Sequence, residues 1–490
     1  MNIRAVKGDA TQIQADAIIV NLFEGVEKPG GATGAVDKAL GGIISELIAR
    51  GDMKGKLGET VIIPTFGKIP SFRVLIVGLG KREDFSKDTI RIASSEALKA
   101  LRKRAKKVAT ILHGAGVGGL DPKTSAMAIT EGAILGLYSY KEKEEDIELM
   151  ILDRTGENLD MIEEGIKTGR IKAEAQNLVR DMVNEPSNLM TPRRLEEKAR
   201  EVAEKRGLKI EVLDREDMER LGMGAILGVS RGSSEPPKFI VLKQGEGGTG
   251  IIGKGITFDS GGISLKSEEA MRNMKGDMAG AAVVIGVMDA ISALNPDLNA
   301  TGIIPACENL PGGSAIKPGD VLKTMSGKTI EVISTDAEGR MILADAISYA
   351  KKLNLSPIID IATLTGACHI ALGDICAGLF SNSDELSSLT IKASEEEGEK
   401  LWRMPLIEEY KEDLKSDIAD IKNLGKRYGG AITAALFLKE FVEDTPWVHL
   451  DIAGPAFSDK EKFYIKKGGT GFGTRTIINL LTKIKEGRGE

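Results

Sequence analysis

The sequence predicts a two-domain α/β fold, for three reasons. The chain has 490 residues, which is more than one hydrophobic core usually spans. Short apolar runs alternate with helix-favouring segments in both halves of the chain, as in sheets covered by helices. Several runs in the second half are apolar on both faces, which is typical of a sheet buried on both sides. We expect an α/β domain over residues 1–154, a connecting helix over 155–182 and a second α/β domain over 183–490.

In the first domain, four apolar runs predict buried strands: AIIVNL, VIIPTF, RVLIVGL and VATILHG. Helices are expected at about residues 34–50, 88–103 and 123–138. Residues 155–182 are charged, favour a helix and contain no proline, which predicts a long connecting helix with one packed and one solvated face. The charged run over residues 141–146 predicts a solvated boundary rather than a partner site.

The second domain is expected to begin near VNEPSNLMTP, where Thr191 can cap a helix whose first residue is Pro192. Its predicted strands are KIEVL, FIVLK, IIGKGITF, GIIPA, TIEVI, IIDIA and WVHLDIA, and helices are expected at residues 280–294, 341–352 and 474–485. Ligands of such sheets gather outside the carboxyl ends of the strands. Asp259, Asp336 and the TLTG segment all follow strand ends, so the pattern converges on one place.

Composition narrows the class of protein. A hydrophobic content of 42% with 28% charged residues is typical of a globular chain. The net charge of −6 gives no general attraction to nucleic acid or an anionic membrane, although a local basic face remains open. Cys307, Cys368 and Cys376 lie in mostly apolar contexts, which fits a reducing compartment. With no signal-peptide pattern and no run of 18 apolar residues, we expect a cytoplasmic enzyme without a membrane partner.

Two segments, over residues 254–278 and 334–340, concentrate acidic and basic groups among small residues. Their charged residues of interest are Lys254, Asp259, Lys266, Asp277, Asp336, Glu338 and Arg340. So many carboxylates at strand ends and in loops would repel one another, or be desolvated at high cost, unless something cationic lay among them. Ordinary strand-end and helix-capping roles are the alternative explanation for these acids.

The types of residue in the chain indicate which kind of metal site could neutralise these acids. His113, His369 and His449 are far apart in the sequence and there is no Cys-x-x-Cys, so a zinc site of the usual His/Cys type is nearly excluded. An oxygen-rich site suits Mn, Mg or carboxylate-bound Zn. Four carboxylates carry about the charge of two divalent ions, which in such pairs lie ~3.5–4 Å apart with a shared water. The hypothesis is a two-metal hydrolase.

Two other motifs are weighed against this hypothesis. The stretch from Gly228 to Gly232 matches the G-x-S-x-G nucleophile elbow of serine hydrolases, with Ser230 as nucleophile. An elbow connects a strand to a helix, whereas a loop-like Gly-Ser-Ser-Glu-Pro-Pro follows here. The stretch from Gly245 to Gly250 matches G-x-G-x-x-G but leads into another strand, which favours a hairpin turn over a dinucleotide site.

The charged segments closely resemble the leucyl aminopeptidase family, the cytosolic M17 metallopeptidases, whose signature NTDAEGR is preceded by a Lys-Asp-Lys-Asp segment. The resemblance extends through VNEPSNLMTP, GMGAILGVSRGS, DIATLTGAC, GGAITAALFL and HLDIAG. Ser334 stands where the family has asparagine, and its shorter side chain predicts a looser shell around Asp336. The stretch PGGATGAVDKALGG resembles the macro-domain-like N-terminal region of the family; turns and close packing explain its glycines better than a phosphate site does.

The resemblance implies a macro-domain-like N-terminal domain joined by a connecting helix to an α/β catalytic domain with a central mixed sheet. It also implies an aminopeptidase with two divalent ions, Mn²⁺ or Zn²⁺, in each subunit. One ion is expected on Asp259, Asp336 and Glu338, and the other on Lys254, Asp259, Asp277 and Glu338. Lys254 can bind a metal only as the neutral amine, so two nearby cations and burial are expected to depress its pKa.

By the same resemblance, a water or hydroxide bridging the metals attacks the peptide, and protonated Lys266 stabilises the developing oxyanion. Arg340 is expected to hold a bicarbonate ion that acts as general base. The side-chain pocket is expected at Met274, Thr363, Gly366, Ala453 and Ala456, with the backbone of Leu364 accepting from the substrate.

The expected substrates are peptides with a free N-terminus, with a broad or leucine-type preference, and the expected assembly is a homohexamer. Some family members also act in DNA-binding assemblies, and the basic segments KREDFSK and LRKRAKK are the candidates for such a patch here. The net charge of −6 speaks against a nucleic-acid partner.

Overall fold

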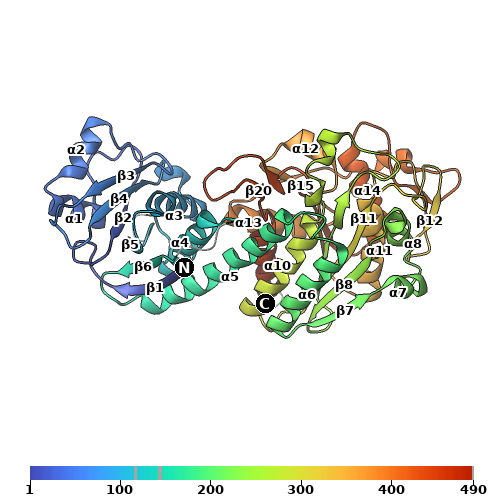
Figure 1. Ribbon diagram of the computed structural model, residues 1–490, viewed down its shortest axis with the longest axis horizontal. Coiled ribbons are helices and arrows are strands. Elements are labelled where there is room, and N and C mark those ends of the chain that lie inside the picture. The colour runs from blue at the N-terminus through green and yellow to red at the C-terminus, as the bar shows by residue number, and fades with distance from the viewer. Residues whose placement is uncertain (115–117, 142–145, 488–490) are drawn as a thin grey trace. The chain divides into compact units, whose positions relative to one another are not determined.

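The computed structural model describes residues 1–114, 118–141 and 146–487 (Figure 1). The chain divides into two compact units. Unit 1 contains residues 1–177 together with 460–466, and unit 2 contains residues 178–459 and those from 467 onward. Helix α5 (Leu159–Asn184) covers most of the expected connecting segment and continues from unit 1 into unit 2. The charged run at 141–146 lies largely outside the described residues.

Unit 1 is a sheet covered by helices on both faces. Its strands are β1 (Asn2–Lys7), β2 (Ala17–Leu22), β3 (Thr60–Pro64), β4 (Arg73–Gly78), β5 (Lys107–Ile111) and β6 (Glu148–Asp153), in the order β1-β6-β5-β2-β4-β3. Its helices are α1 (Gly31–Leu40), α2 (Ile43–Arg50), α3 (Lys87–Leu101) and α4 (Pro122–Leu137), with a short 3₁₀ turn η1 (Arg82–Asp84). Ile19 and Leu75 face α3 and α4, while Ile18 and Ile76 face α1 and α2, so each strand buries both faces.

The four predicted strands of unit 1 are present, but two details differ from the sequence-based expectation. The expected helix over residues 34–50 is two helices, because Gly41 and Gly42 adopt the left-handed conformation, with φ of 80° and 86°. Glycine reaches this region without steric cost and ends α1 there. Strands β1 and β6, which pair in parallel, were not predicted.

Unit 2 is built on a mixed sheet, as expected. Its strands are β7 (Lys209–Leu213), β8 (Lys238–Gln244), β9 (Thr249–Gly253), β10 (Gly255–Asp259), β11 (Ala300–Asn309), β14 (Ile358–Ala362), β15 (Cys376–Ser381), β16 (Lys400–Arg403) and β18 (Trp447–Asp451). Their order is β16-β15-β18-β14-β9-β11-β8-β7, with β10 pairing on β11. Smaller sheets join β12 (Val321–Lys323), β13 (Thr329–Glu331) and β17 (Ile421–Lys422), and β19 (Phe457–Ser458) with β20 (Gly468–Gly469).

The helices of unit 2 lie on both faces of this sheet. They are α6 (Pro192–Arg206), α7 (Arg215–Arg220), α8 (Gly224–Val229), α9 (Glu268–Met271), α10 (Ala279–Leu294), α11 (Gly339–Lys352), α12 (Gly366–Leu372), α13 (Asp384–Glu397), α14 (Gly430–Val442) and α15 (Thr474–Gly487), with 3₁₀ turns η2 (Ser230–Gly232), η3 (Met274–Gly276) and η4 (Glu408–Leu414). Thr191 caps α6 by accepting from the Arg194 amide, and Pro192 follows it, as predicted.

Two strand predictions in unit 2 were wrong in detail. The run IIGKGITF is broken at Lys254 into β9 and β10. The stretch from Gly245 to Gly250 is not a hairpin turn, because β11 lies between β8 and β9. Turn residues specify a local reversal of the chain, but they do not reveal that a strand from residue 300 onward inserts between its two arms.

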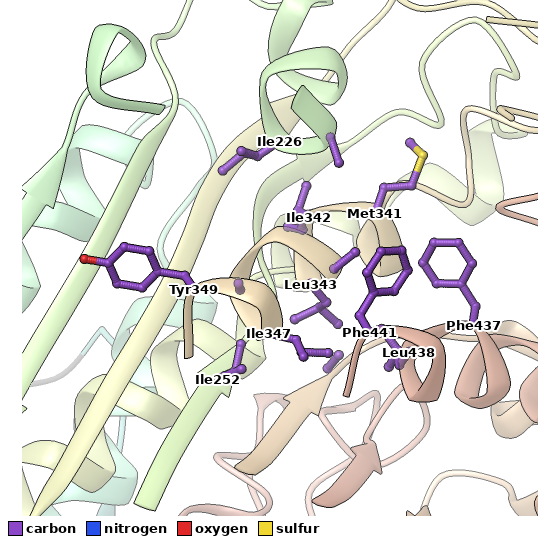
Figure 2. Close-up of a cluster of buried hydrophobic side chains, with 14 of the residues drawn as sticks. Ile226, Ile252, Met341, Ile342, Leu343, Ile347, Tyr349, Phe437, Leu438 and Phe441 are labelled. Atoms are coloured by element: carbon purple, nitrogen blue, oxygen red, sulfur yellow. The ribbon is translucent and has the colours of Figure 1, made fainter. Parts of the chain in front are cut away.

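The core of unit 2 packs around α11, which carries part of the candidate site at its N-terminus. Figure 2 shows Leu343 and Ile347 of α11 lying between Ile252 of β9 and the aromatic side of α14, while Ile342 lies toward Ile226 of α8. Leu343 is fully buried, and truncating such a leucine to alanine costs ~2–5 kcal/mol. Tight packing along α11 therefore fixes the position of the loop that precedes it.

Helix α10 packs against the opposite face, and small residues let its N-terminus approach the sheet. A Cβ on Gly253 would lie 2.3 Å from the carbonyl oxygen of Gly280, and a Cβ on Gly280 would lie 2.1 Å from that of Ile361. These glycines bring the turn before α10 against the ends of β9 and β14. By length and composition the stretch Glu268–Leu294 could cross a membrane, but 83% of its apolar window is buried, as in a core helix.

Candidate metal and peptidase site

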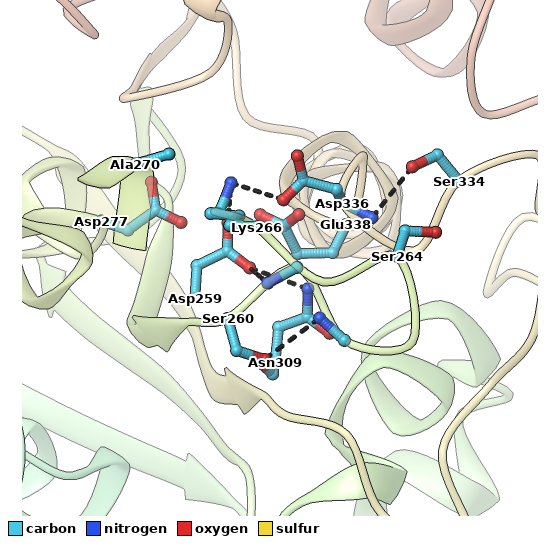
Figure 3. Close-up of polar contacts among 12 residues, drawn as sticks. Asp259, Ser260, Ser264, Lys266, Ala270, Asp277, Asn309, Ser334, Asp336 and Glu338 are labelled. Carbon is cyan, nitrogen blue, oxygen red and sulfur yellow. Dashed lines mark hydrogen bonds and ion pairs between the residues drawn. The ribbon is translucent and has the colours of Figure 1, made fainter. Parts of the chain in front are cut away.

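The candidate site lies where the carboxyl ends of neighbouring strands meet in unit 2. Asp259 is the last residue of β10, and Lys254 occupies the break between β9 and β10. Asp277 follows η3 and leads into α10, while Asp336 and Glu338 lie in the loop after β13, with Glu338 at the N-cap of α11. The two charged segments singled out from the sequence are thus neighbours in space (Figure 3).

Lys254 forms the inner ion-pair centre of the site. Its side chain is 4% exposed, and its Nζ lies 2.7 Å from Asp277 Oδ2 and 3.0 Å from Glu338 Oε1. The same Nζ donates to the carbonyl oxygen of Thr363 at 3.0 Å. Gly339 makes room for this lysine, since a Cβ there would lie 2.5 Å from Lys254 Cε.

Lys266 forms a second, outer ion-pair centre. Its Nζ lies 2.9 Å from Asp259 Oδ2 and also contacts Asp336 Oδ1, which Figure 3 marks by a dashed line. The Lys266 side chain is 15% exposed and that of Asp336 is 37% exposed, so this pair faces solvent more than the Lys254 pair does. The two lysines divide the acids into an inner and an outer set.

The electrostatics of the site show an excess of negative charge. Among the described residues, four carboxylates, of Asp259, Asp277, Asp336 and Glu338, face only two ammonium groups in direct contact. Burial raises the pKa of Asp277 and Glu338, and the neighbouring Asp259 raises both further. Burial likewise raises the pKa of Asp336. The carboxyl groups of Asp277, Asp336 and Glu338 resist ionisation chiefly because they are buried, and the nearby acids add to this effect against the opposing pull of the two lysines.

The pKa of Lys254 shifts in the opposite direction from the one a neutral amine requires. Burial alone lowers it, but attraction from Asp277, Glu338 and Asp259 outweighs burial, and the net pKa is raised. The lysine is therefore protonated while the carboxylates have no other cation. The prediction that Lys254 binds a metal as the neutral amine concerns the metal-loaded protein and stays a prediction.

The residues present fit a divalent metal ion. Carboxylate oxygens of Asp259, Asp336 and Glu338 lie within 4.8 Å of one another, close enough to share an ion. Glu338 Oε2 is buried and has no hydrogen-bond partner among the described residues. A buried carboxylate oxygen without a partner is costly unless it coordinates a cation. An all-oxygen set of this kind suits Mn²⁺, Mg²⁺ or carboxylate-bound Zn²⁺.

Arg340 lies on the first turn of α11 beside these acids. It is 5% exposed, and its Nη1 donates to the carbonyl oxygen of Asn423 at 2.9 Å. Burial lowers its pKa to about 10, against the opposing effect of Glu338 and Asp451, so the guanidinium stays charged at neutral pH. Its Nε is buried without a hydrogen-bond partner in the part of the chain that the structure describes. A charged guanidinium with an unpaired N–H donor suits a small oxyanion such as bicarbonate.

Of the residues predicted for the substrate pocket, Thr363 contacts one of the acids directly. Thr363 Oγ1 donates to Asp277 Oδ1 at 2.7 Å. Asp451 Oδ1 accepts from the amides of Leu364 and Ala453, both at 3.2 Å, and so holds the loops after β14 and β18 together. Gly366 begins α12, Ala456 is buried at 5% exposure, and Met274 begins η3. The role of each in binding substrate is untested by this geometry.

Several residues that position the site were missed from the sequence. Asn309, at the end of β11, donates from Nδ2 to Asp259 Oδ1 and to the Thr335 carbonyl oxygen, at 2.8 and 2.9 Å. Thr335 in turn contacts the loop after β10 by donating to the Gly261 carbonyl oxygen at 2.5 Å. Asn423 clamps the loop before α11. The available signal was a polar residue at the end of a strand for Asn309 and directly after one for Asn423, and Thr335 carried no such signal.

Ser334, which departs from the family signature, closes the turn before Asp336. Its Oγ accepts from the Asp336 amide at 3.2 Å (Figure 3). Its backbone is held by Asn423, which donates from Nδ2 to the Ser334 carbonyl oxygen at 2.7 Å. Polar contacts therefore occupy the shell that the sequence predicted to be looser, and the effect on metal affinity stays a prediction.

Ser230 does not sit in a nucleophile elbow. It follows α8 and begins η2, whereas an elbow connects a strand to a helix. Its side chain is fully buried and donates to the Leu227 carbonyl oxygen at 3.0 Å. The glycines around it serve packing, because a Cβ on Gly232 would lie 1.8 Å from the Leu310 carbonyl oxygen. The serine hydrolase alternative has no support in this geometry.

Comparison with known sequences covers both units. The N-terminal domain of the cytosol aminopeptidase family matches residues 19–145, and its catalytic domain matches residues 177–478. A probable cytosol aminopeptidase of Alkaliphilus metalliredigens (strain QYMF) is 45% identical over 502 residues, covering 99% of this chain and 100% of the relative. A probable cytosol aminopeptidase of Aquifex aeolicus (strain VF5) is 44% identical over 494 residues, covering 99% of both chains.

Solved structures of similar proteins superpose on both units of this chain. A mutant of tomato leucine aminopeptidase superposes with a TM-score of 0.87 at 34% identity, covering 99% of this chain and 96% of that chain. The bottromycin maturation enzyme BotP in complex with Mn superposes with a TM-score of 0.85, also at 34% identity, covering 96% and 99%. With its two-domain α/β fold and acidic site, this chain belongs to the cytosol aminopeptidase family, a metal-dependent family of peptidase hydrolases.

Proposed function

We propose that this chain is a two-metal aminopeptidase that removes the N-terminal residue from peptides. The observation that carries the proposal is the buried cluster of acids with too little positive charge, in which Glu338 Oε2 lacks any hydrogen-bond partner among the described residues. Membership of the family supports the reaction class, and the acid cluster supports a metal requirement. The number of ions, their identity and the role of each residue are parts of the proposal.

The chain's own residues divide the work of holding the ions. One ion is assigned to Asp259, Asp336 and Glu338, and the other to Lys254, Asp259, Asp277 and Glu338. Bound divalent ions such as Mn²⁺ or Zn²⁺ supply a water of lowered pKa and polarise the scissile carbonyl. For Lys254 to take part, it must give up a proton, which its carboxylate neighbours oppose in the metal-free protein.

Lys266 is assigned to stabilise the oxyanion that develops at the scissile carbonyl. Burial lowers its pKa, but attraction to Asp259, Glu338 and Asp336 outweighs burial and raises the pKa overall, so the group remains a cation. A fixed cation at the mouth of a partly desolvated site is worth most in the transition state, when the negative charge appears. Its partial exposure leaves it accessible to a substrate.

Arg340 is assigned to hold a bicarbonate ion that accepts a proton as general base. Its planar guanidinium can bind a planar anion through two parallel hydrogen bonds. The unpaired Nε and the low exposure of Arg340 support this role, because a buried donor gains most from a new acceptor.

The pocket residues favour an apolar N-terminal side chain on the substrate. The candidates Met274, Ala453 and Ala456 present carbon and sulfur atoms and no charge, and Gly366 has open space where a Cβ would point. A pocket of this composition binds a substrate side chain more tightly the more apolar surface that side chain buries, by about 25 cal/mol per Å². We therefore propose a broad preference that includes leucine.

The test is hydrolysis of leucine p-nitroanilide and of its N-acetylated form by the full chain, before and after removal of metal with a chelator. We expect cleavage of the free-amine substrate, loss of activity on chelation and recovery with Mn²⁺ or Zn²⁺. The acetylated substrate should resist, since its nitrogen can no longer bind a metal. Equal cleavage of both substrates, or full activity in protein shown by elemental analysis to lack metal, would overturn the proposal.

The second role, in DNA binding, gains no support from unit 1. KREDFSK ends at the first residue of α3 and LRKRAKK begins at its last. A helix of 15 residues is ~22 Å long, so the two basic segments lie at its opposite ends instead of forming one patch. A cytoplasmic location and a homohexamer remain proposals, supported by the names of the relatives and by the family resemblance respectively.

A further inference from the structure

Asn423 lies immediately after β17 and is fully buried. Strand β17 pairs in parallel with β13, with Glu331 opposite Lys422, and the Asn423 amide continues this pairing by donating to the Glu331 carbonyl oxygen at 3.0 Å. Strand β13 ends at Glu331, Val332 still pairs with Gly319 and Asp320, and the backbone from Ile333 onward has no partner strand in the described part of the chain. That unpaired backbone leads directly to Asp336 and Glu338.

The side-chain amide of Asn423 replaces the missing strand. Its Oδ1 accepts from the amide of Ile333 at 2.7 Å and from that of Ser334 at 3.4 Å. Its Nδ2 donates to the Ser334 carbonyl oxygen at 2.7 Å and to that of Ala337 at 3.4 Å. One side chain therefore ties both ends of the turn that bears Asp336, as a backbone segment would.

The backbone of Asn423 also contacts Arg340. Its carbonyl oxygen accepts from Arg340 Nη1 at 2.9 Å and so anchors that guanidinium. The Nε of Arg340 has no partner among described residues, so this contact orients the group. Asn423 thus links the acid-bearing turn and the arginine through a single rigid residue.

We infer that Asn423 is a positioning residue for the reaction, which sets the metal-holding turn and Arg340 in register with each other. The inference rests on the proposed function, since it concerns the same site. Asn423 contacts none of the pocket residues proposed above, so its effect belongs to kcat and metal affinity and not to substrate binding. A carboxylate cannot replace it, because the contacts to two carbonyl oxygens need an N–H donor.

The test compares Asn423→Asp and Asn423→Ser with wild type and with Asn382→Asp, all in the full chain. Asn382 is a matched control: its Nδ2 donates to the carbonyl oxygens of Glu443 and Thr445, and its Oδ1 accepts from the Trp447 amide. It clamps backbone in the same way, but it is more exposed and touches none of the site residues. Each protein is stripped of metal and titrated with Mn²⁺ by calorimetry, and Tm, kcat and KM are measured.

For both Asn423 variants we expect Mn²⁺ affinity and kcat at saturating Mn²⁺ each to fall about 10–100-fold. KM should stay within about threefold, because the substrate contacts are intact. Asn382→Asp should lower Tm only. If the Asn423 variants also lower Tm only, the positioning role is refuted; if Asn423→Asp does not fold, Asn423→Ser decides. A wild-type protein that binds no Mn²⁺ and cleaves no peptide would instead refute the proposed function.

Discussion

Replacing Lys254 by alanine tests the inner ion-pair centre of the site, and replacing Lys266 tests the outer one. Lys254 is almost fully buried and contacts Asp277, Glu338 and the Thr363 carbonyl oxygen at 2.7–3.0 Å. Removing it from the metal-free protein leaves two buried carboxylates without their nearest cation. Breaking a buried pair in this way destabilises a fold by about 3–5 kcal/mol.

The loss in Lys254→Ala should be recovered by metal. A ligand that binds only the folded state at 100 times its Kd stabilises it by ~2.7 kcal/mol. A divalent ion should therefore restore much of the missing positive charge, although the ion on the Lys254 side binds more weakly without its amine. Activity should rise again as Mn²⁺ is added.

Lys266→Ala should behave differently. Its ion pairs are partly solvated, with Asp336 37% exposed, so the loss of stability should be smaller. Both metals should remain bound, and kcat should fall about 10²–10³-fold with a modest effect on KM, as for loss of one oxyanion contact. The assays are thermal unfolding with and without Mn²⁺, metal content by elemental analysis, and kcat against added Mn²⁺. Rescue of the Lys266 variant and not of the Lys254 variant would show that the roles are reversed.

Three further predictions concern other residues. Asp259→Ala and Glu338→Ala should each abolish activity and reduce the metal content, and either variant keeping normal turnover with two ions per chain would contradict the assignment. Arg340→Ala should slow turnover with metal content intact; loss of metal by elemental analysis would indicate a structural role instead. Burial lowers the pKa of His113 to about 4, and its Nδ1 faces the Nδ2 donor of Asn21 at 2.9 Å. As the pH falls, the unfolded chain binds a proton at this histidine before the folded chain does. The contribution of His113 to the free energy of unfolding should therefore be complete above pH ~6.5 and should fall by roughly 3 kcal/mol as the pH drops to about 4. His113→Gln should flatten this fall in an acid-range unfolding series, and an unchanged slope would count against the reasoning.

Two acids of the site could be placed from the strand pattern, because Asp259 follows the run IIGKGITF and Asp336 follows the run TIEVI, whereas Asp277 follows no apolar run. Asp259 ends β10, where parallel pairing with β11 brings it to a common edge, and the strand pattern alone implies this. The break at Lys254 was not predicted, because this residue lies within an otherwise apolar run that reads as one strand. Its deviation from the strand depends on Gly339, 85 positions away, leaving room for its side chain.

Contacts between residues distant in sequence account for the other differences. Nothing local marks residues 460–466 as part of unit 1, where Tyr464 donates to Asp88 Oδ1 at 2.6 Å. Asn423 was missed for the same reason, since its partners lie some 90 positions earlier. By contrast, the split between α1 and α2 was available in the sequence as Gly41-Gly42, a pair that commonly ends helices.

The two lysines among the acids affect the order in which this enzyme folds and takes up metal. Lys254 and Lys266 act as internal counter-ions, so the pocket can close before any metal reaches it. Folding and metal loading are then separate events, unlike in small zinc domains that remain unfolded without metal. An ion held beside Lys254, as proposed, would require the amine to release its proton, so metal uptake at that position would weaken as the pH falls.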